Sequence, residues 1–146
     1  MIVKIPYGKK MLDLDVGNKK VDICAGTDVE TPDNEEILLK NALSKPINSR
    51  RIKDIAKDKK NVCIVINDIT RPTPSKLILE AIFKELEEAK MPKSEIKILI
   101  ANGNHRPATR EELIMMIGEE IVNEYKIINH VATNDDELSY LGDTPL

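Results

Sequence analysis

The sequence predicts an α/β protein: a Rossmann-like parallel sheet in a three-layer sandwich, preceded by a β-hairpin. Three short and largely apolar runs, at residues 62–66, 96–100 and 125–128, have the composition of buried parallel strands. The segments between them space their apolar residues as helices do, which gives a βαβαβ order. At 146 residues the chain has the length of one domain, so residues 1–146 are taken as one α/β domain.

The N-terminal region alternates apolar and polar residues, as hairpin strands do. Residues 1–5 and 11–16 are the two expected strands, and Tyr7-Gly8-Lys9-Lys10 is the turn between them. A further short strand is expected at residues 21–24.

Two helices are expected before the first parallel strand. The sequence Thr-Pro-Asp-Asn at residues 31–34 opens a helix that runs to about Leu43, with Ile37 and Leu38 also on its buried stripe. Residues 49–57 are a shorter and basic helix candidate, and the charged run that closes it is interpreted as a solvated face.

The helices of the βαβαβ unit carry their own start signals. Ser75 is expected to cap a helix that extends to about Lys90. Thr109 and Glu112 have the spacing of a capping box, so the next helix should begin directly after the loop at residues 103–107.

Composition and missing motifs exclude several classes of function. A formal net charge of −3 gives no basic footprint for nucleic acid. No apolar run approaches the roughly 20 residues of a membrane span, and no signal peptide follows Met1. Cys24 and Cys63 lack metal-site spacing and are expected to be buried free thiols, which favours a cytoplasmic protein. The chain has no dinucleotide fingerprint, P-loop, HExxH or GxSxG motif, so no metal ligands are assigned to it.

Polar residues follow two of the expected strands at the point where each strand ends. The first group runs from Asn67 to Ser75 and the second from Asn102 to Pro107. Ligands of open α/β sheets bind outside the carboxyl ends of the strands, and right-handed crossovers bring these ends to one edge. The sequence therefore predicts a site where the two groups meet.

Two residues of this site are candidates for catalysis. Arg71 offers a planar fork that matches a carboxylate or phosphate, and Pro72 holds its backbone extended. His105 can accept and return a proton near neutral pH. It can equally be a loop histidine that bonds a neighbouring carbonyl, and His130 at the third strand tip is a weaker candidate.

The residues before Arg71 allow more than one role. Asp68 can orient Arg71 or His105, accept a bond from a ligand hydroxyl, or serve as a turn or cap aspartate. Thr70 can cap the turn or donate to a ligand. The residues alone indicate an anion-binding arginine and a histidine acid/base that face a shared cleft.

The chain thus carries two motifs, Asp68-Ile69-Thr70-Arg71-Pro72 and Gly103-Asn104-His105-Arg106-Pro107, followed by a tail with Asn129-His130 and Tyr140-Leu141-Gly142-Asp143-Thr144. At this spacing they resemble the N-terminal region of the nickel-dependent lactate racemase family. The resemblance extends over essentially the whole chain.

The resemblance implies an enzyme that inverts the hydroxyl-bearing carbon of a small 2-hydroxy acid with a nickel-pincer nucleotide. In such enzymes a histidine removes the hydroxyl proton while hydride moves to the cofactor, and the resulting 2-keto acid receives hydride on its opposite face. By residue-to-residue match, His105 corresponds to one of two acid/base histidines and Arg71 to the substrate-holding arginine. Asp68, Ile69, Thr70 and Arg71 correspond to a cofactor-contacting segment.

The other functional residues of that family belong to motifs beyond Leu146: the second catalytic histidine, the cofactor-bearing lysine and the nickel-ligating histidine. We therefore expect a fragment that lacks a C-terminal domain and that is inactive by itself. The alternative is a stand-alone domain that binds a small carboxylate or phosphate without catalysis. The sequence identifies neither the particular 2-hydroxy acid nor the oligomeric state.

Overall fold

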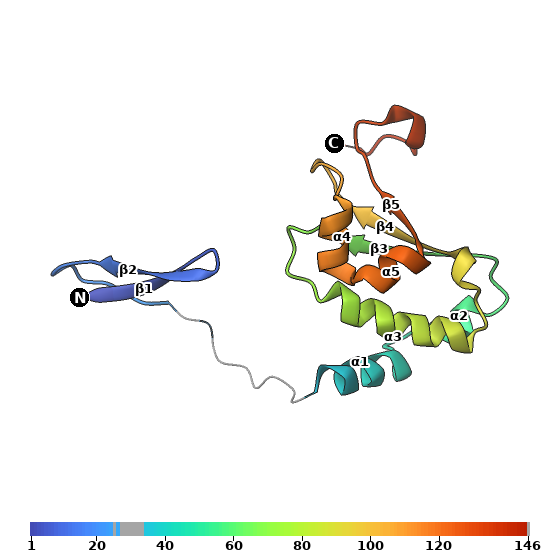
Figure 1. The fold of residues 1–146 in the computed structure, drawn as a ribbon, viewed down its shortest axis with the longest axis horizontal. Helices are drawn as coiled ribbons and strands as arrows, with labels where there is room; N and C mark the ends of the chain where they lie inside the picture. Colours follow the sequence, from blue (N-terminus) through green and yellow to red (C-terminus); the bar gives the residue numbers. More distant parts are fainter. Residues whose placement is uncertain (25, 27–33, 146) are drawn as a thin grey trace. The chain divides into compact units, whose positions relative to one another are not determined.

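The chain divides into two units, Met1–Thr31 and Pro32–Leu146 (Figure 1). The structure, a computed structural model, describes residues 1–24, 26 and 34–145. Each unit is presented by itself below. Among the described residues, no helix combines the length and the apolar character needed to cross a membrane.

The N-terminal unit is the expected hairpin. Strands β1 (Ile2–Tyr7) and β2 (Lys10–Asp15) are antiparallel, and Tyr7 lies opposite Lys10. Gly8 in the turn has φ +59°, a conformation that a residue without Cβ adopts at little cost. The strand expected at residues 21–24 does not form in the described structure, because the segment pairs with no neighbouring strand that would satisfy its backbone groups.

Three parallel strands organise the larger unit. They are β3 (Val62–Asn67), β4 (Ile96–Ala101) and β5 (Lys126–Asn129), hydrogen-bonded in the order β3-β4-β5. The register places Asn67 opposite Ala101 and Ile100 opposite Asn129, so the three strands end at one edge. The predicted βαβαβ order is confirmed.

The connecting helices are α3 (Ser75–Glu88), α4 (Arg110–Ile117) and α5 (Glu119–Glu124). The capping box of Thr109 and Glu112 forms at the start of α4, as predicted. Ser75 makes no capping bond, because the N-cap position of α3 is occupied by Pro74 and Ser75 is already the first helical residue. Short 3₁₀ turns lie at Lys93–Glu95 and Asp135–Glu137.

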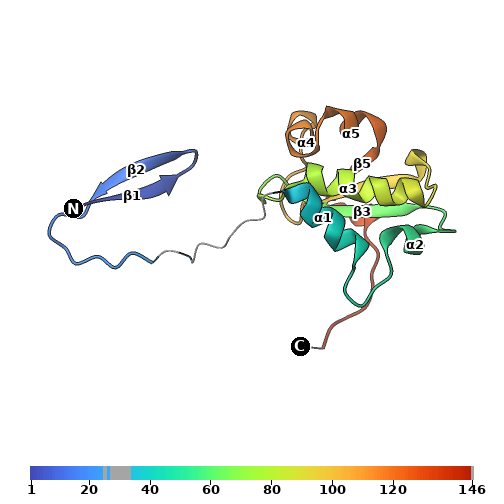
Figure 2. The ribbon, with the colours of Figure 1, turned by 90° about the horizontal axis from the view of Figure 1, so that it is seen from below.

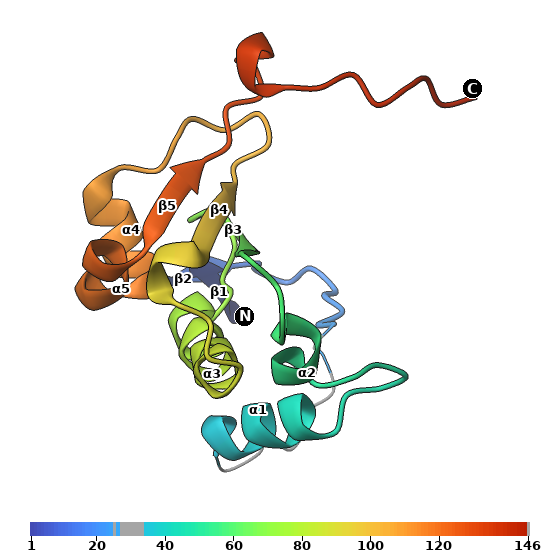
Figure 3. The same cartoon turned by 90° about the vertical axis from the view of Figure 1, so that its right-hand side faces the viewer.

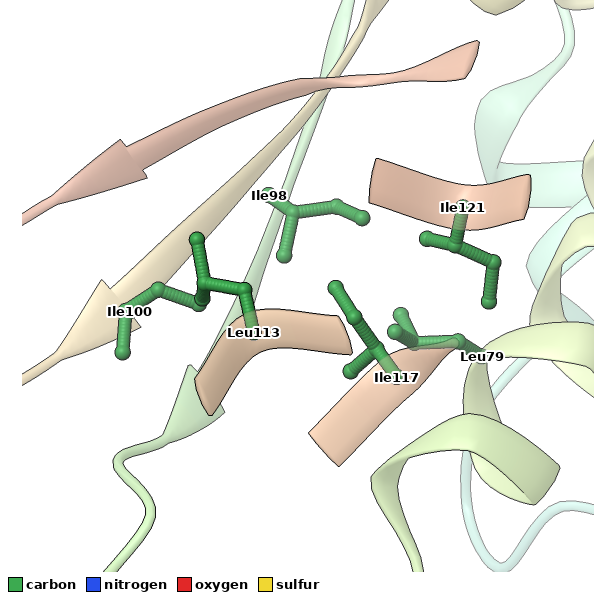
Figure 4. Close-up of a cluster of buried hydrophobic side chains, with 6 residues drawn as sticks. All are labelled: Leu79, Ile98, Ile100, Leu113, Ile117 and Ile121. Atoms are coloured by element: carbon green, nitrogen blue, oxygen red, sulfur yellow. The ribbon is translucent and has the colours of Figure 1, made fainter. Parts of the chain in front are cut away.

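All three connecting helices pack on the same face of the sheet. Figure 3 shows α4 and α5 together beside β4 and β5, and Figure 2 shows α3 running along the sheet. Their shared core is a cluster of branched aliphatic side chains (Figure 4): Leu79, Ile98, Ile100, Leu113, Ile117 and Ile121. Burial of each such side chain is worth about 1.5–3 kcal/mol, so this cluster stabilises the packing of the three helices on β4.

The described residues form two layers, where the sequence predicted three. A strand order of β3-β4-β5 with right-handed crossovers puts both crossovers on one face of the sheet. On the opposite face Val65 is 60% exposed, and Cys63 beside it is exposed as well. Cys63 and Cys24 are both free thiols, but neither is buried as expected.

Two further helices pack against α3. Helix α1 (Glu35–Ser44) begins at Asn34, whose side chain accepts a bond from Ile37 N at 3.0 Å. Residues 31–33 of the expected start lie outside the described residues. The buried stripe predicted for this helix is not formed, because Ile37 and Leu38 are more than half exposed.

Helix α2 (Ile52–Ala56) is shorter than the predicted helix at residues 49–57. It packs Ala56 against Leu86 of α3. A salt bridge from Arg51 to the buried Glu85 ties its start to the same helix.

Candidate active site

The first strand-tip loop connects β3 to α3 and is closed by local hydrogen bonds. Asn67 Nδ2 donates to Thr73 Oγ1 at 2.8 Å across the loop. Within it, Arg71 N donates to Asp68 O at 3.2 Å, which forms a turn directly after the strand. Pro72 and Pro74 lack a backbone donor and keep this segment from joining the helix early. The loop therefore holds Asp68 and Arg71 at fixed positions on one turn.

The second strand-tip loop connects β4 to α4. His105 N donates to Asn102 O at 2.9 Å, and Gly103 between them has φ +56°. A left-handed backbone is strained for residues with a Cβ, which is the reason a glycine suits this place. The turn directs His105 back toward the first loop.

The two loops meet at a carboxylate–imidazole pair. Nδ1 of His105 lies 2.5 Å from Oδ2 of Asp68, and Thr70 Oγ1 donates to the other carboxylate oxygen at 2.8 Å. The Asp68 side chain is 8% exposed, whereas the His105 side chain is 53% exposed. The pair therefore joins a buried carboxylate to a ring that solvent and ligands can reach.

The surroundings of Asp68 stabilise its ionised form. The hydrogen bond with His105 lowers the pKa of the carboxyl, and the bond from Thr70 lowers it further. Burial acts in the opposite direction, and the charge of Arg71 makes a small additional contribution that lowers the pKa. Asp68 is accordingly a carboxylate at neutral pH and can only accept hydrogen bonds.

A pocket of about 270 Å³ lies between the two loops. The predicted site residues Asp68, Ile69, Thr70 and His105 all line it. Asn102 and Arg106, from the second predicted polar group, also line it, and it is completed by two residues that were not predicted to belong to a site, Ala108 and Glu112. The two motifs do share a cleft, but Arg71, which was expected to face it together with His105, does not line it.

An amide network fixes the second loop to the tip of β5. Asn102 Nδ2 donates to Asn129 Oδ1 at 3.0 Å and to His130 O at 3.1 Å. Asn129 in turn exchanges two bonds with the backbone of Ala108. Sequence reasoning missed the role of both asparagines, although their place directly at strand ends was the available signal.

The guanidinium of Arg106, which lines the pocket, is bonded to a neighbouring carboxylate. The guanidinium donates to both carboxylate oxygens of Glu112, at 2.6 and 2.8 Å, and to Pro107 O at 3.1 Å. Glu112 also accepts from Thr109 N in the capping box. These contacts lower the pKa of Glu112 from its usual 4.5 to about 2, with the Arg106 bonds as the largest cause.

Arg71 has a different environment from Arg106. Its side chain is exposed, and among the described residues it makes no hydrogen bond or salt bridge. It does not line the pocket itself but follows Asp68 in the same turn. The guanidinium of Arg71 thus lies close enough to Asp68 for its charge to act on that carboxyl, and its donors make no bond within the described part of the chain.

His130 contributes through its backbone. Its N donates to Ile100 O at 3.1 Å and its carbonyl accepts from Asn102, while its ring is half-buried outside the pocket lining. The weaker support given to this histidine by the sequence agrees with its place.

The pocket offers contacts for an organic group more readily than for a metal ion. Ile69 and Ala108 supply apolar wall, and the buried Oδ1 of Asn102 lacks a hydrogen-bond partner among the described residues. No cluster of three His, Cys, Asp or Glu side chains occurs in the part of the chain that the structure describes. The lining therefore combines an apolar wall with one buried polar atom open to a hydrogen-bond donor, and the described part of the chain supplies no cluster of metal ligands.

Comparison with protein families gives one match that spans nearly the whole chain. Residues 7–146 match the model described as the lactate racemase N-terminal domain. Two similar relatives are lactate racemases, from Thermoanaerobacterium thermosaccharolyticum at 33% identity and from Lactiplantibacillus plantarum at 32% identity. Each alignment covers 98% of this chain but 34% of the relative, so the chain spans about a third of their length.

Solved structures give a consistent result. The lactate racemase apoprotein from T. thermosaccharolyticum superposes with a TM-score of 0.82 at 32% identity, covering 99% of this chain and 34% of that one. A crystal structure of a Thermotoga maritima protein matches with a TM-score of 0.57 at 24% identity, over 75% of this chain and 24% of that protein. The second likeness concerns the fold alone.

Proposed function

The chain belongs to the lactate racemase N-terminal domain family, and from that premise we propose that it forms one wall of the active site of an enzyme that racemises a small 2-hydroxy acid. The observation that supports this most directly is the Asp68–His105 pair in a pocket at the strand tips, with Arg71 in the same turn as Asp68 and its side chain without a partner among the described residues. Because the relatives are about three times longer, the activity is proposed for the intact protein.

Arg71 binds the carboxylate of the substrate in this proposal. A guanidinium fork forms two parallel charge-assisted bonds with a carboxylate, which fixes both the position and the orientation of the acid. His105 then exchanges the proton of the neighbouring hydroxyl, since its ring is exposed and an imidazole changes charge near neutral pH. A second acid/base group on the opposite side of the carbon is needed for inversion and is assigned to the rest of the protein.

The proposed cofactor is a nickel-pincer nucleotide held in the same pocket. When bound, this group supplies the site with a reversible acceptor for the hydride of the hydroxyl-bearing carbon. Ile69, Thr70 and Ala108 line the pocket and offer apolar and hydroxyl contacts to it from this chain. Arg71, the last residue of the expected cofactor-contacting segment Asp68 to Arg71, lies outside the lining and is assigned to the substrate. The ligands of the nickel and the covalent tether are assigned to residues outside this chain.

The test is enantiomer exchange by the intact protein carrying its cofactor. When the protein is incubated with D-lactate or L-lactate, the lactate should approach a racemic mixture. Chiral chromatography measures the proportion of the two enantiomers over time. Arg71→Ala and His105→Ala should each reduce exchange below detection, whereas Arg50→Ala, an exposed arginine outside the site, should leave it unchanged.

Each outcome separates one part of the proposal. Exchange retained in either site variant removes that residue from its role. Lactate bound by the wild-type protein without any exchange favours the alternative, a small-anion binding domain without catalysis. The 146-residue chain alone is expected to give no exchange, and measurable racemisation by it would contradict the assignment of the second acid/base group.

A further inference from the structure

Both oxygens of the Asp68 carboxylate are already engaged by side chains of this chain. Thr70 Oγ1 donates to Oδ1 at 2.8 Å, and Nδ1 of His105 lies 2.5 Å from Oδ2. The side chain is 8% exposed, so little of it remains for another partner. A residue placed in this way is better suited to hold His105 than to bind a cofactor.

This contact determines which nitrogen of His105 carries the proton. The carboxylate of Asp68 can only accept, so the short contact requires a proton on Nδ1. When the ring is neutral, Nε2 is therefore the unprotonated nitrogen and the one free to take a proton. An imidazole without such a partner distributes its proton between the two nitrogens.

The backbone of His105 is fixed independently of its ring. Its N–H donates to Asn102 O at 2.9 Å, and the buried Asn102 side chain is bonded to the tip of β5. With the backbone fixed, the ring of His105 can still rotate about its side-chain bonds. The bond to Asp68 prevents this rotation. Ring orientation and proton position thus depend on the same carboxylate.

We propose that Asp68 is a positioning residue that holds His105 with its proton on Nδ1 and leaves Nε2 as the atom that exchanges a proton with a ligand. Thr70 supports this by fixing the other carboxylate oxygen. The proposal deepens the proposed function and rests on it for the identity of the reaction, but the state of the ring is a property of this chain alone. In this proposal Asp68 no longer contacts the cofactor, and its role is to orient His105.

The first test is the protonation pattern of the imidazole in the chain without any cofactor. The sequence has two histidines, so ¹⁵N-histidine labelling gives two ring spin systems, and His130→Gln assigns them. Long-range ¹H–¹⁵N correlation spectra at a pH where the ring is neutral should show His105 as the Nδ1–H tautomer. A wild-type ring with its proton on Nε2 would overturn the proposal without any variant being made.

Variants then locate the cause. Asp68→Ala should return His105 to a mixture of tautomers, and Thr70→Val should produce the same change to a smaller extent. Asp54→Asn, which alters an exposed carboxylate on α2, should leave the ring signals as they are. If Asp68→Ala does not fold, as judged by circular dichroism, the tautomer of His105 in the wild type and in Thr70→Val still tests the proposal. An unchanged Nδ1–H signal in folded Asp68→Ala contradicts the proposal.

The second test uses the intact protein and separates positioning from cofactor binding. Asp68→Asn should lower kcat by about 100-fold or more, as loss of a histidine-orienting carboxylate does in a catalytic triad, with KM for the hydroxy acid little changed. Nickel content per protein should equal that of the wild type. A fall in nickel content together with an unchanged ring tautomer would assign Asp68 to the cofactor instead.

Failure of the proposed function gives a different result. An intact protein that racemises no 2-hydroxy acid, but whose His105 ring keeps the Asp68-dependent tautomer, would remove the racemase proposal and leave the positioning role in place. If the intact protein racemises a 2-hydroxy acid but the tautomer of His105 does not depend on Asp68, the racemase proposal stands and the positioning role of Asp68 is removed.

Discussion

The two strand-tip loops contain the same dipeptide, Arg-Pro, in opposite structural settings. In the loop after β3, the Arg71 side chain is exposed and makes no hydrogen bond or salt bridge with other described residues. In the loop after β4, Arg106 donates to both carboxylate oxygens of Glu112 and to Pro107 O. One arginine is available for a ligand, and the other is part of the scaffold.

The difference shows that the motif alone does not tell whether an arginine can bind a ligand. The hydrogen bonds that its guanidinium already makes decide this. Both Nη atoms of Arg106 already donate to the Glu112 carboxylate, so an anion would compete with Glu112 for them. Arg71 has no such competitor within the described structure. The same contrast extends to the backbones, because the second loop depends on a left-handed glycine and a capping box, and the first depends on prolines.

The sharpest test of this contrast is the exchange of each arginine for lysine in the intact protein. Arg71→Lys keeps the charge but loses the fork, and we expect kcat/KM for lactate to fall roughly 10- to 100-fold, the equivalent of one charge-assisted bond. Arg106→Lys should change it by less than about threefold, because the side chain serves the loop. Equal losses in the two variants would show that the distinction between the loops is mistaken.

The backbone contrast is tested at Gly103. Because this residue has φ +56° and nothing lies within 4 Å of where a Cβ would stand, Gly103→Ala introduces strain without a clash. The free energy of unfolding in urea should fall by about 1–2 kcal/mol. Gly103→Asn is the control, since asparagine adopts this conformation more readily, and it should lose less. A loss as large in the asparagine variant would point to a cause other than backbone strain.

The starts of helices α3 and α4 also differ, and we expect substitutions there to change the free energy of unfolding by less than those at Gly103. Thr109 accepts from Glu112 N and caps α4, whereas Ser75 at the start of α3 makes no capping bond. Thr109→Ala should lower the free energy of unfolding by about 1 kcal/mol. Ser75→Ala should change it by less than about 0.5 kcal/mol, and thermal or urea unfolding of both variants measures the difference. A larger effect at Ser75 would mean that its hydroxyl supports α3 in another way.

The smallest expected effect is the dependence of stability on acid. The pKa of Glu112 is lowered from 4.5 to about 2 in the folded chain, so the unfolded chain binds a proton more readily. Its contribution to stability is therefore present above pH 4.5 and is lost as the pH falls toward 2. Denaturation midpoints of the wild type should drop more over this interval than those of Glu112→Gln. Parallel curves would show that the Arg106–Glu112 pair does not set the acid response.

Much of the fold followed from short-range patterns in the sequence. The three parallel strands, the hairpin and the capping box were predicted from residues within a few positions of one another, and all are present. Two of the exceptions have one origin. The segment at residues 21–24 has the composition of a strand but no pairing partner in the described structure, and Ile37 and Leu38 have helical spacing but little to pack against.

The sequence predicted most residues of the candidate site but only some of the contacts between them. Asp68, Ile69, Thr70 and His105 line one pocket as expected, whereas Arg71, which was expected to face the same cleft, does not line it. The sequence left open whether Asp68 would orient Arg71, orient His105 or serve the turn, and the choice of His105 depends on a contact between residues 37 positions apart. The bond between Asn102 and Asn129 was missed because it joins amides 27 positions apart.

The sequence by itself therefore determined the elements and the chemistry available at their ends, because periodicity, turn residues and caps act over one or two turns of chain. The tertiary structure decided which face of the sheet the helices cover, which of the two arginines is paired, and which residue the buried carboxylate holds. Those outcomes depend on strand register and on crossovers that bring distant loops within hydrogen-bonding distance, and no local pattern encodes such distances.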